Sequence, residues 1–293
     1  MKRTLVLLAA LSSLPLAAQA QLTTPAEKSA AQTIESGDLR AHIGFLASDL
    51  LEGRGPGTRG DALAQHYLAT QFQLLGLKPA GADGGYLQPF ELVSMSGHPE
   101  TLTFTSGSGH TELRFHDDFI ASSGVQTAEA VLQDSELVFV GYGIQAPEYQ
   151  WDDFKGMDLR GKTLLILNND PEDDPKLFGG KARLRYGRWD YKYEQAAKVG
   201  AAGAIILHTT PSAGYAWQVV QTSWSGEQFE LPASEDTPRL QMKAWMTDEA
   251  TRRVLRLSDK ELDSLRLAAQ KREFRPVPLG VRVSTRFANR VRR

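Results

Sequence analysis

The sequence predicts a mixed α/β protein with a small α/β module in the middle of the chain. Two short apolar runs without polar alternation, Thr163 to Leu167 and Ala204 to Leu207, are typical of strands buried on both faces. Residues 191–198 between them mix apolar and charged side chains without Pro or Gly, as a short surface helix does, and Gly200 can end that helix. A helix between two buried strands forms an α/β unit, and we expect the other segments to lie on either side of it.

The first twenty residues, 1–20, are predicted to be a cleavable signal peptide. A positive pair, Lys2-Arg3, precedes an apolar run that is too short to span a bilayer. The small-x-small signature Ala18-Gln19-Ala20 predicts cleavage after Ala20, with an uncleaved anchor as the alternative. The leader indicates export to the periplasm or secretion, and we expect no membrane association once it is cleaved.

Composition excludes several classes of function. The chain has 293 residues, enough for one large or two ordinary domains, and a net charge of -2 that gives no basic excess for nucleic acid. It contains no Cys, which excludes disulfides, thiol catalysis, cysteine-bound metal and lipidation of the leader. We therefore expect a globular exported protein that does not bind nucleic acid.

Two helices are predicted in the N-terminal part, separated by a glycine-rich stretch. Apolar residues recur at helical spacing over 39–51, where Ser36 or Asp38 can cap the helix, and again over 61–75. Residues 52–60 hold four glycines and a proline, which disfavour regular structure and allow close backbone approach. This stretch is either a flexible loop or a shaped loop in which Arg54 or Arg59 pairs with a carboxylate.

The remaining elements are mostly short strands. Alternating residues predict strands at 101–105 and 111–115 around a glycine turn, a further strand at 136–140, and a strand-like segment at 277–287. Residues 211–236 are expected to be rich in loops, and residues 259–270 to form a helix. The central module is thus flanked by strands on both sides in the sequence.

Three groups of residues are candidate sites for a cofactor or metal. Gly141-Tyr142-Gly143 after a strand imitates a dinucleotide fingerprint, but the helix that this chemistry needs does not follow. His110, Glu112 and His116 would share one strand face and could bind zinc, yet Arg114 between them opposes a cation. The acidic run 170–174 lacks the spacing of a calcium loop. A solvated polar face and a solvated turn are the expected alternatives.

Nucleophilic catalysis has no support in the sequence, because no Gly-x-Ser-x-Gly elbow is present. His208 ends a buried strand, where catalytic groups can lie, although a lone histidine there is more often structural. Three tryptophans could form a surface that stacks sugars or peptides, but aromatic rings mainly stabilise a protein by burial: Trp217, Trp224 and Trp245.

Several motifs together resemble secreted di-zinc aminopeptidases of metallopeptidase family 28. The run Ile43 to Arg54 with Gly57-Thr58-Arg59-Gly60, and then Gly76 to Gly81, resembles the opening of those enzymes. Residues 136–147, 152–154, 161–163, 169–171 and 186–208 are similar to the protease-associated (PA) domain inserted in them. The resemblance covers nearly all of the chain after the leader, in order.

The resemblance implies an enzyme that removes N-terminal residues from peptides with two zinc ions and a glutamate base. It also implies that the zinc ligands follow the PA insertion, beginning with His-x-Asp and including a Glu-Glu pair. No Glu-Glu dipeptide occurs in this chain, and its one His-x-Asp, His116-Asp117-Asp118, precedes the PA-like part. We therefore assign no catalytic, cofactor-binding or metal residue, and we expect zinc only in a full-length member of the family.

The sequence thus predicts an incomplete N-terminal part of a peptidase domain at 21–125, a PA-like module at 126–250 and a segment at 251–293 that returns toward a missing catalytic sheet. We expect such a truncated or split gene product to be inactive alone, with the apolar faces of its two helices exposed. The alternative is an exported, non-catalytic PA-type module that binds peptides or proteins. An enzyme with an unfamiliar site at His110 and His116 is a third possibility.

Overall fold

A computed structural model describes residues 24–293 except 108, 173, 183 and 235, so the expected signal peptide and its cleavage site lie outside the described residues. The described chain divides into two compact units, up to Pro89 and from Phe90 onward. Among these residues no helix is both long and apolar enough to cross a membrane.

The first unit consists of helices. Helix α1 (Pro25–Ala31) comes first, and α2 (Ser36–Leu46) is followed by the 3-10 helix η1 (Asp49–Arg54) and by α3 (Arg59–Leu74). The helix predicted over 39–51 therefore begins after the true start at Ser36 and runs past the true end at Leu46, because the chain leaves the helix at Ala47-Ser48 before η1 begins. The expected caps were also wrong, since the residue that caps α2 is Glu35, which makes no side-chain capping bond.

The glycine-rich stretch is a shaped connection between η1 and α3. The hydroxyl of Thr58 accepts a hydrogen bond from Asp61 N, and the Asp61 carboxylate accepts one from Gly57 N. Within the described part of the chain Arg54 and Arg59 make no ion pair, so the expected arginine–carboxylate pair is not found there. Helix α3 instead approaches η1 so closely at Gly60 that its missing Cβ is essential to the contact.

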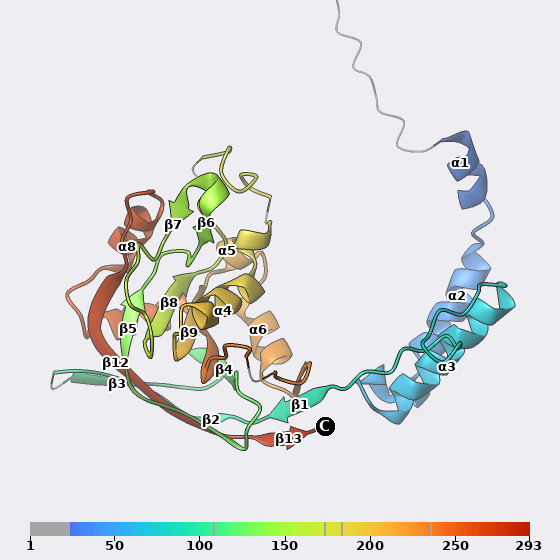
Figure 1. Cartoon of the computed structure of the whole chain (residues 1–293), viewed down its shortest axis with the longest axis horizontal. Coiled ribbons are helices and arrows are strands. Elements are labelled where there is room, and N and C mark those ends of the chain that lie inside the picture. Colours follow the sequence, from blue (N-terminus) through green and yellow to red (C-terminus); the bar gives the residue numbers. More distant parts are fainter. Residues whose placement is uncertain (1–23, 108, 173, 183, 235) are drawn as a thin grey trace, which may run out of the picture. The chain divides into compact units, whose positions relative to one another are not determined.

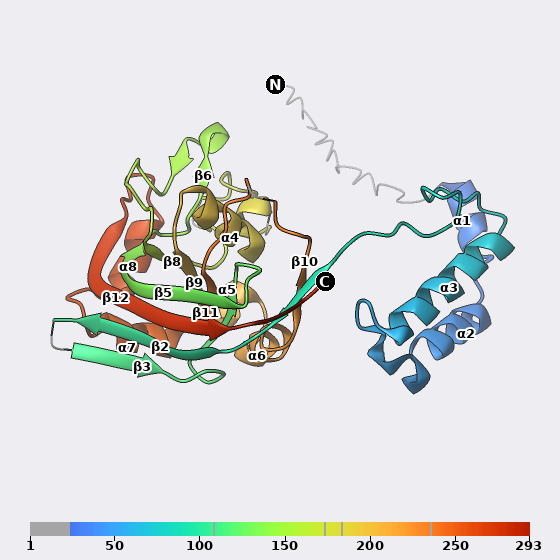
Figure 2. The same cartoon turned by 60° about the horizontal axis from the view of Figure 1, so that its bottom comes forward.

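The second unit is built on an eight-stranded mixed sheet with the order β3-β2-β12-β5-β8-β9-β11-β4 (Figures 1 and 2). Its strands are β2 (Pro99–Ser106), β3 (Gly109–Leu113), β4 (Phe119–Ser123), β5 (Glu129–Phe139), β8 (Thr163–Leu167), β9 (Gly203–His208), β11 (Met242–Thr247) and β12 (Val277–Ala288). Strands β5, β8, β9 and β11 are parallel, and the others pair antiparallel. The predicted mixed α/β fold is confirmed.

Smaller sheets complete this unit. Strand β1 (Val93–Ser96) lies between β10 (Gln228–Glu230) and β13 (Arg290–Arg292), and β6 (Gln145–Ala146) pairs with β7 (Trp151–Asp152). The segment 251–293, expected to return toward a catalytic sheet, places β12 between β2 and β5 of the large sheet. Residues from all three segments expected after the leader therefore share one sheet.

Helices cover both faces of the parallel strands. Helix α4 (Trp189–Lys198) and α6 (Trp217–Trp224) contribute to one apolar cluster, whereas α7 (Asp248–Leu255) and α8 (Leu262–Ala269) contribute to the other. Successive residues of β8 alternate between these clusters, with Leu164 and Ile166 on the α4 side and Leu165 and Leu167 on the α8 side. The two expected buried strands are thus confirmed as strands buried on both faces.

Several elements of this unit were not predicted from the sequence. Strand β11 and helix α7 were not expected, nor was the 3-10 helix η3 (Arg185–Gly187) before α4. The short helix α5 (Thr210–Ala213) and helix α6 lie mostly in the region expected to be loops. A 3-10 turn, η2 (Pro147–Tyr149), joins β6 to β7. These elements are short, and their residues mix polar and apolar character, so no long periodic pattern marks them.

Replacing Gly60 with Ala is expected to weaken helix α3. A Cβ at this position would lie 1.8 Å from the carbonyl oxygen of Leu51, so α3 and η1 must move apart at a cost of about 1–3 kcal/mol. Hydrogen exchange of α3 amides in the full chain, followed by mass spectrometry, measures the loss.

Gly44→Ala in α2 is the matched control, because a Cβ there meets no atom within 4 Å. This change is expected to stabilise the helix by about 0.5–1 kcal/mol. Equal protection of α3 in wild type and Gly60→Ala would contradict the close contact.

Candidate functional site

The carboxyl ends of the parallel strands gather buried polar residues. Strands β8 and β9 end at Leu167 and His208, and the residues that follow β8 are Asn168, Asn169 and Asp170, all buried. A cavity of about 330 Å³ opens at this edge. It is lined by residues from the strand ends, from α5 and from α8: Tyr142, Leu167, Asn168, Leu207, Thr209, Pro211, Ser212, Arg266 and Gln270. Ligands of α/β sheets often bind at this edge.

A fully buried lysine holds the edge together. Lys192, on α4, donates hydrogen bonds from Nζ to the carbonyl oxygens of Tyr142 and Tyr186, each at 2.7 Å. Burial lowers the pKa of the Lys192 ammonium, while electrostatic attraction to Asp153 and Asp170 acts in the opposite direction. The ammonium thus ties the loop after β5 to the η3 turn that precedes α4.

Asp153 is the buried carboxylate beside this lysine. Its two oxygens accept hydrogen bonds from Ile144 N at 2.9 Å and from Trp151 Nε1 at 2.8 Å. Burial raises the pKa of Asp153, and the hydrogen bonds and Lys192 counteract that rise. Both partners of Asp153 lie in or beside the β6–β7 hairpin, so this carboxylate fixes the hairpin at the same edge of the sheet.

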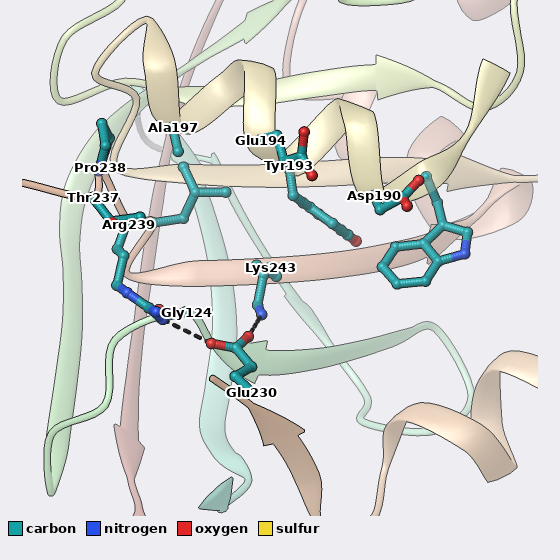
Figure 3. Close-up of a pocket in the computed structure, with 12 residues that line it drawn as sticks. Gly124, Asp190, Tyr193, Glu194, Ala197, Glu230, Thr237, Pro238, Arg239 and Lys243 are labelled. Atoms are coloured by element: carbon teal, nitrogen blue, oxygen red, sulfur yellow. Dashed lines mark hydrogen bonds and ion pairs between the residues drawn. The ribbon is translucent and has the colours of Figure 1, made fainter. Parts of the chain in front are cut away.

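A second cavity, of about 230 Å³, lies along one side of α4 (Figure 3). Trp189, Asp190, Tyr193, Glu194 and Ala197 line it from the helix. The facing wall comes from the segment that enters β11, together with Gly124 and Glu230: Thr237, Pro238, Arg239, Leu240 and Lys243. We call this space the α4 cavity.

Charged residues close one end of the α4 cavity. The Glu230 carboxylate accepts hydrogen bonds from Lys243 Nζ and, at 2.7 Å, from Arg239 Nη1, and both ion pairs are drawn in Figure 3. Burial acts to raise the pKa of Glu230, but Lys243 and Arg239 outweigh it, so its pKa lies below the ordinary value. All three side chains are no more than one quarter exposed.

The proposed histidine metal site is not assembled. His110 and Glu112 lie on β3, whereas His116 lies in the following turn, where its carbonyl oxygen accepts hydrogen bonds from Trp217 and Gln221. Arg114, which lies between His110 and His116 in the sequence, pairs with Asp117 at 3.5 Å and with Asp118 at 3.9 Å. In the part of the chain that the structure describes, no cluster of three or more His, Cys, Asp or Glu residues is arranged to hold a metal ion.

The glycines and the acidic run that were candidates from the sequence lie in turns and loops. A strand and a 3-10 turn follow Gly141 and Gly143, so the helix required of a dinucleotide site is absent from this described segment. The acidic run differs from the expected solvated turn, because Asp170 is almost fully buried and Glu172 accepts a hydrogen bond from Asn169. Asp173 lies outside the described residues.

His208 and the tryptophans belong to the core around β9 and β11. His208 is only 4% exposed and packs against the rings of Tyr215, Trp217 and Trp245, and burial lowers its pKa. Trp245 is 1% exposed, and Trp217 and Trp224 pack on the same apolar cluster. The three tryptophan rings therefore pack in or against the core, as in the alternative that aromatic rings stabilise the protein by burial.

Sequence reasoning missed the residues that matter most here. Lys192, Arg239, Lys243 and Glu230 carry no motif, and Glu230 meets the two cations only through the fold. One available signal was Lys192 itself, which stands in a helix whose flanking positions, Tyr191 and Tyr193, are aromatic. Aromatic residues on both sides of a lysine are compatible with an aliphatic stem that packs against apolar surface, although the sequence does not show that the ammonium is buried too.

Comparisons with known proteins find aminopeptidases among solved structures. An aminopeptidase from Aneurinibacillus sp. strain AM-1 matches with a TM-score of 0.35 and 19% identity, covering 88% of this chain and 47% of that chain. Two structures of a zinc aminopeptidase from Bacillus subtilis match with a TM-score of 0.29 and 15% identity, covering 86% of this chain and 43% of theirs. This chain thus spans less than half the length of each. No protein-family model and no curated protein matches it.

Replacing Lys192 with Met is expected to cost about 3–5 kcal/mol of unfolding free energy at pH 7, because Asp153 and two carbonyl groups stay buried without their cation. Urea denaturation followed by tryptophan fluorescence measures this change. Lys198→Met on the same helix is the control and is expected to be nearly neutral, since Lys198 is exposed. A similar loss of unfolding free energy in both variants would contradict a stabilising role for the Lys192 hydrogen bonds.

Replacing Glu230 with Gln is expected to flatten the acid limb of the stability profile. The pKa of Glu230 is lower in the folded protein than its ordinary value of 4.5, so its contribution is complete above about pH 4.5 and is lost as the pH falls through the folded pKa. Urea denaturation between neutral and acid pH measures the slope. Glu249→Gln, at an exposed carboxylate, is the control. A wild-type slope in the Glu230 variant would contradict the assignment.

Proposed function

We propose that this chain is part of an exported zinc aminopeptidase of metallopeptidase family 28, and that residues 126–250, within the unit from Phe90 onward, are its PA-type module. In this proposal the described residues hold and present peptides or a protein partner, while the zinc centre belongs to the rest of the enzyme. The peptidase is placed in the periplasm or outside the cell by its leader. The ordered sequence motifs from Ile43 to His208 support the assignment to this family.

The observation that carries the proposal is the set of uncovered apolar side chains in the unit 24–89, taken by itself. Helices α2 and α3 and the turn η1 expose large apolar residues: Leu39, Ile43, Phe45, Leu50, Leu63, Leu68, Phe72, Leu74 and Leu75. Leu50, Leu74 and Leu75 are each more than 70% exposed. So many exposed large apolar side chains on a short helical unit favour an interface or a place in a larger domain, as expected for helices that pack against a peptidase sheet.

A second candidate function is an exported module that binds peptides or proteins without catalysis. One observation favours it: the unit from Phe90 onward has apolar clusters on both faces of its sheet, as a domain that folds by itself requires. If this function is correct, the purified chain is a monomer in size-exclusion chromatography. If the helices instead belong to a larger domain, the chain self-associates, and Leu74→Ser with Leu75→Ser reduces that association.

The decisive assay measures hydrolysis by the purified chain from Gln21 onward, with an aminoacyl-p-nitroanilide series as substrates. The expected result is no release of p-nitroaniline above the blank and no stoichiometric zinc in elemental analysis. The reason is that the proposed zinc ligands belong to another part of the enzyme. His116→Ala is the control for the unfamiliar histidine site. Hydrolysis that a chelator abolishes, with no second polypeptide present, would overturn the proposal.

A further inference from the structure

The α4 cavity has an apolar end and a cationic end. Its volume of about 230 Å³ is below the roughly 300–1,000 Å³ of typical small-molecule sites, so it has room for one side chain rather than for a larger ligand. Tyr193 and Ala197 stand one helical turn apart on α4, and Leu240 lies on the facing segment. The Tyr193 hydroxyl already donates to the carbonyl oxygen of Ala244 at 2.7 Å, so the cavity meets its ring rather than a free hydroxyl.

The cationic end carries a net charge of +1, because one carboxylate, Glu230, faces Lys243 and Arg239. A lysine and an arginine together offer about eight N–H donors. Within the described residues these donors meet only the Glu230 oxygens and the carbonyl oxygen of Gly124. Donors thus outnumber acceptors in a place where both cations are only 20% exposed, which favours an anionic acceptor.

The carboxylates at the helix side of the cavity do not offset this charge. Asp190 pairs with Arg188 at 3.1 Å, and Glu194 pairs with Arg185 at 3.4 Å. Both acids are more than 40% exposed, so solvent and salt screen them more than they screen the end at Glu230. The cavity therefore selects against a cationic tip and for an apolar group joined to an anion.

We propose that the α4 cavity binds the carboxyl-terminal residue of a peptide that ends in an apolar side chain. The side chain lies against Tyr193, Ala197 and Leu240, and the terminal carboxylate accepts hydrogen bonds from Lys243 and Arg239. Carboxyl-terminal capture is a recurring mode of peptide recognition. This inference rests on the proposed function only in taking peptides as the class of ligand, and it involves no hydrolysis.

Titration of the full chain with Ala-Ala-Phe, with its C-terminal amide, with Ala-Ala-Asp and with free phenylalanine tests the proposal by calorimetry. The expected order places Ala-Ala-Phe first, about tenfold tighter than its amide, because a charge-assisted hydrogen bond is lost in the amide. Equal binding of acid and amide would overturn carboxylate capture. Free phenylalanine binding as tightly as the tripeptide would assign the cavity to an amino acid and overturn the peptide terminus.

Two variants locate the binding. Lys243→Met is expected to abolish the preference for acid over amide, and Ala197→Leu to weaken both ligands about tenfold by filling the apolar end. Leu267→Ala on α8, at an exposed side chain outside the cavity, is the control and is expected to bind as wild type does. Thermal melting checks folding, and Ala197→Val replaces Ala197→Leu if that variant melts early.

A Lys243→Met chain that keeps the wild-type preference, or filled variants that bind normally, would overturn the site. Failure of the cavity proposal and failure of the proposed function give different results. Chelator-sensitive hydrolysis would refute the proposed function and leave the binding order unchanged, whereas loss of the acid–amide difference would refute the cavity and leave the peptidase assignment unchanged.

Discussion

The arrangement of the α/β unit depends on one buried cation. Lys192 is fully enclosed, and its ammonium group reaches the carbonyl oxygens of Tyr142 and Tyr186, which belong to two loops far apart in the sequence. A buried ion pair contributes little net stability compared with an apolar replacement of the same shape, but removal of one partner is costly. The Lys192 ammonium here fixes the positions of the loops after β5 and before α4, because neither loop can shift without leaving polar groups unpaired.

Helix α4 therefore makes different contacts on two of its sides. The Lys192 side is fixed at the carboxyl edge of the parallel strands, where Asp153 anchors the β6–β7 hairpin. The side that carries Tyr193 and Ala197 lines the α4 cavity. Because the lysine holds the helix by interior contacts, the cavity wall is set before any ligand arrives. A preorganised wall reduces the ordering that a ligand must bring about.

The sequence predicted the parts of this structure that are periodic or uninterrupted. The strand Thr163–Leu167 was found at its observed bounds, because five consecutive apolar or branched residues have no alternative but burial on both faces. The helices α2 and α3 were predicted from the helical spacing of their apolar residues, although their ends were shifted. Strand β11 was missed because Lys243 interrupts its apolar run, and that lysine is needed to meet Glu230.

The candidate site was the part that sequence alone could not supply. Glu230 lies 9 residues before Arg239 and 13 before Lys243, with a loop between, and no local rule states that one carboxylate will receive both cations. Strand β10 brings Glu230 to the two cations. It pairs with β1, more than a hundred residues upstream, and this pairing places Glu230 near the start of β11.

The same pairing explains why the cavity is cationic at one end only. The carboxylates of α4 stand where solvent and neighbouring arginines neutralise them, whereas Glu230 must divide its charge between two partly buried cations. One carboxylate cannot balance two cations, so a net positive charge stays beside apolar walls. In water that imbalance would be screened, but beside Leu240 and Tyr193 the lower dielectric strengthens it. The fold thus places an unbalanced charge next to apolar surface, which is the combination that an apolar carboxylate complements.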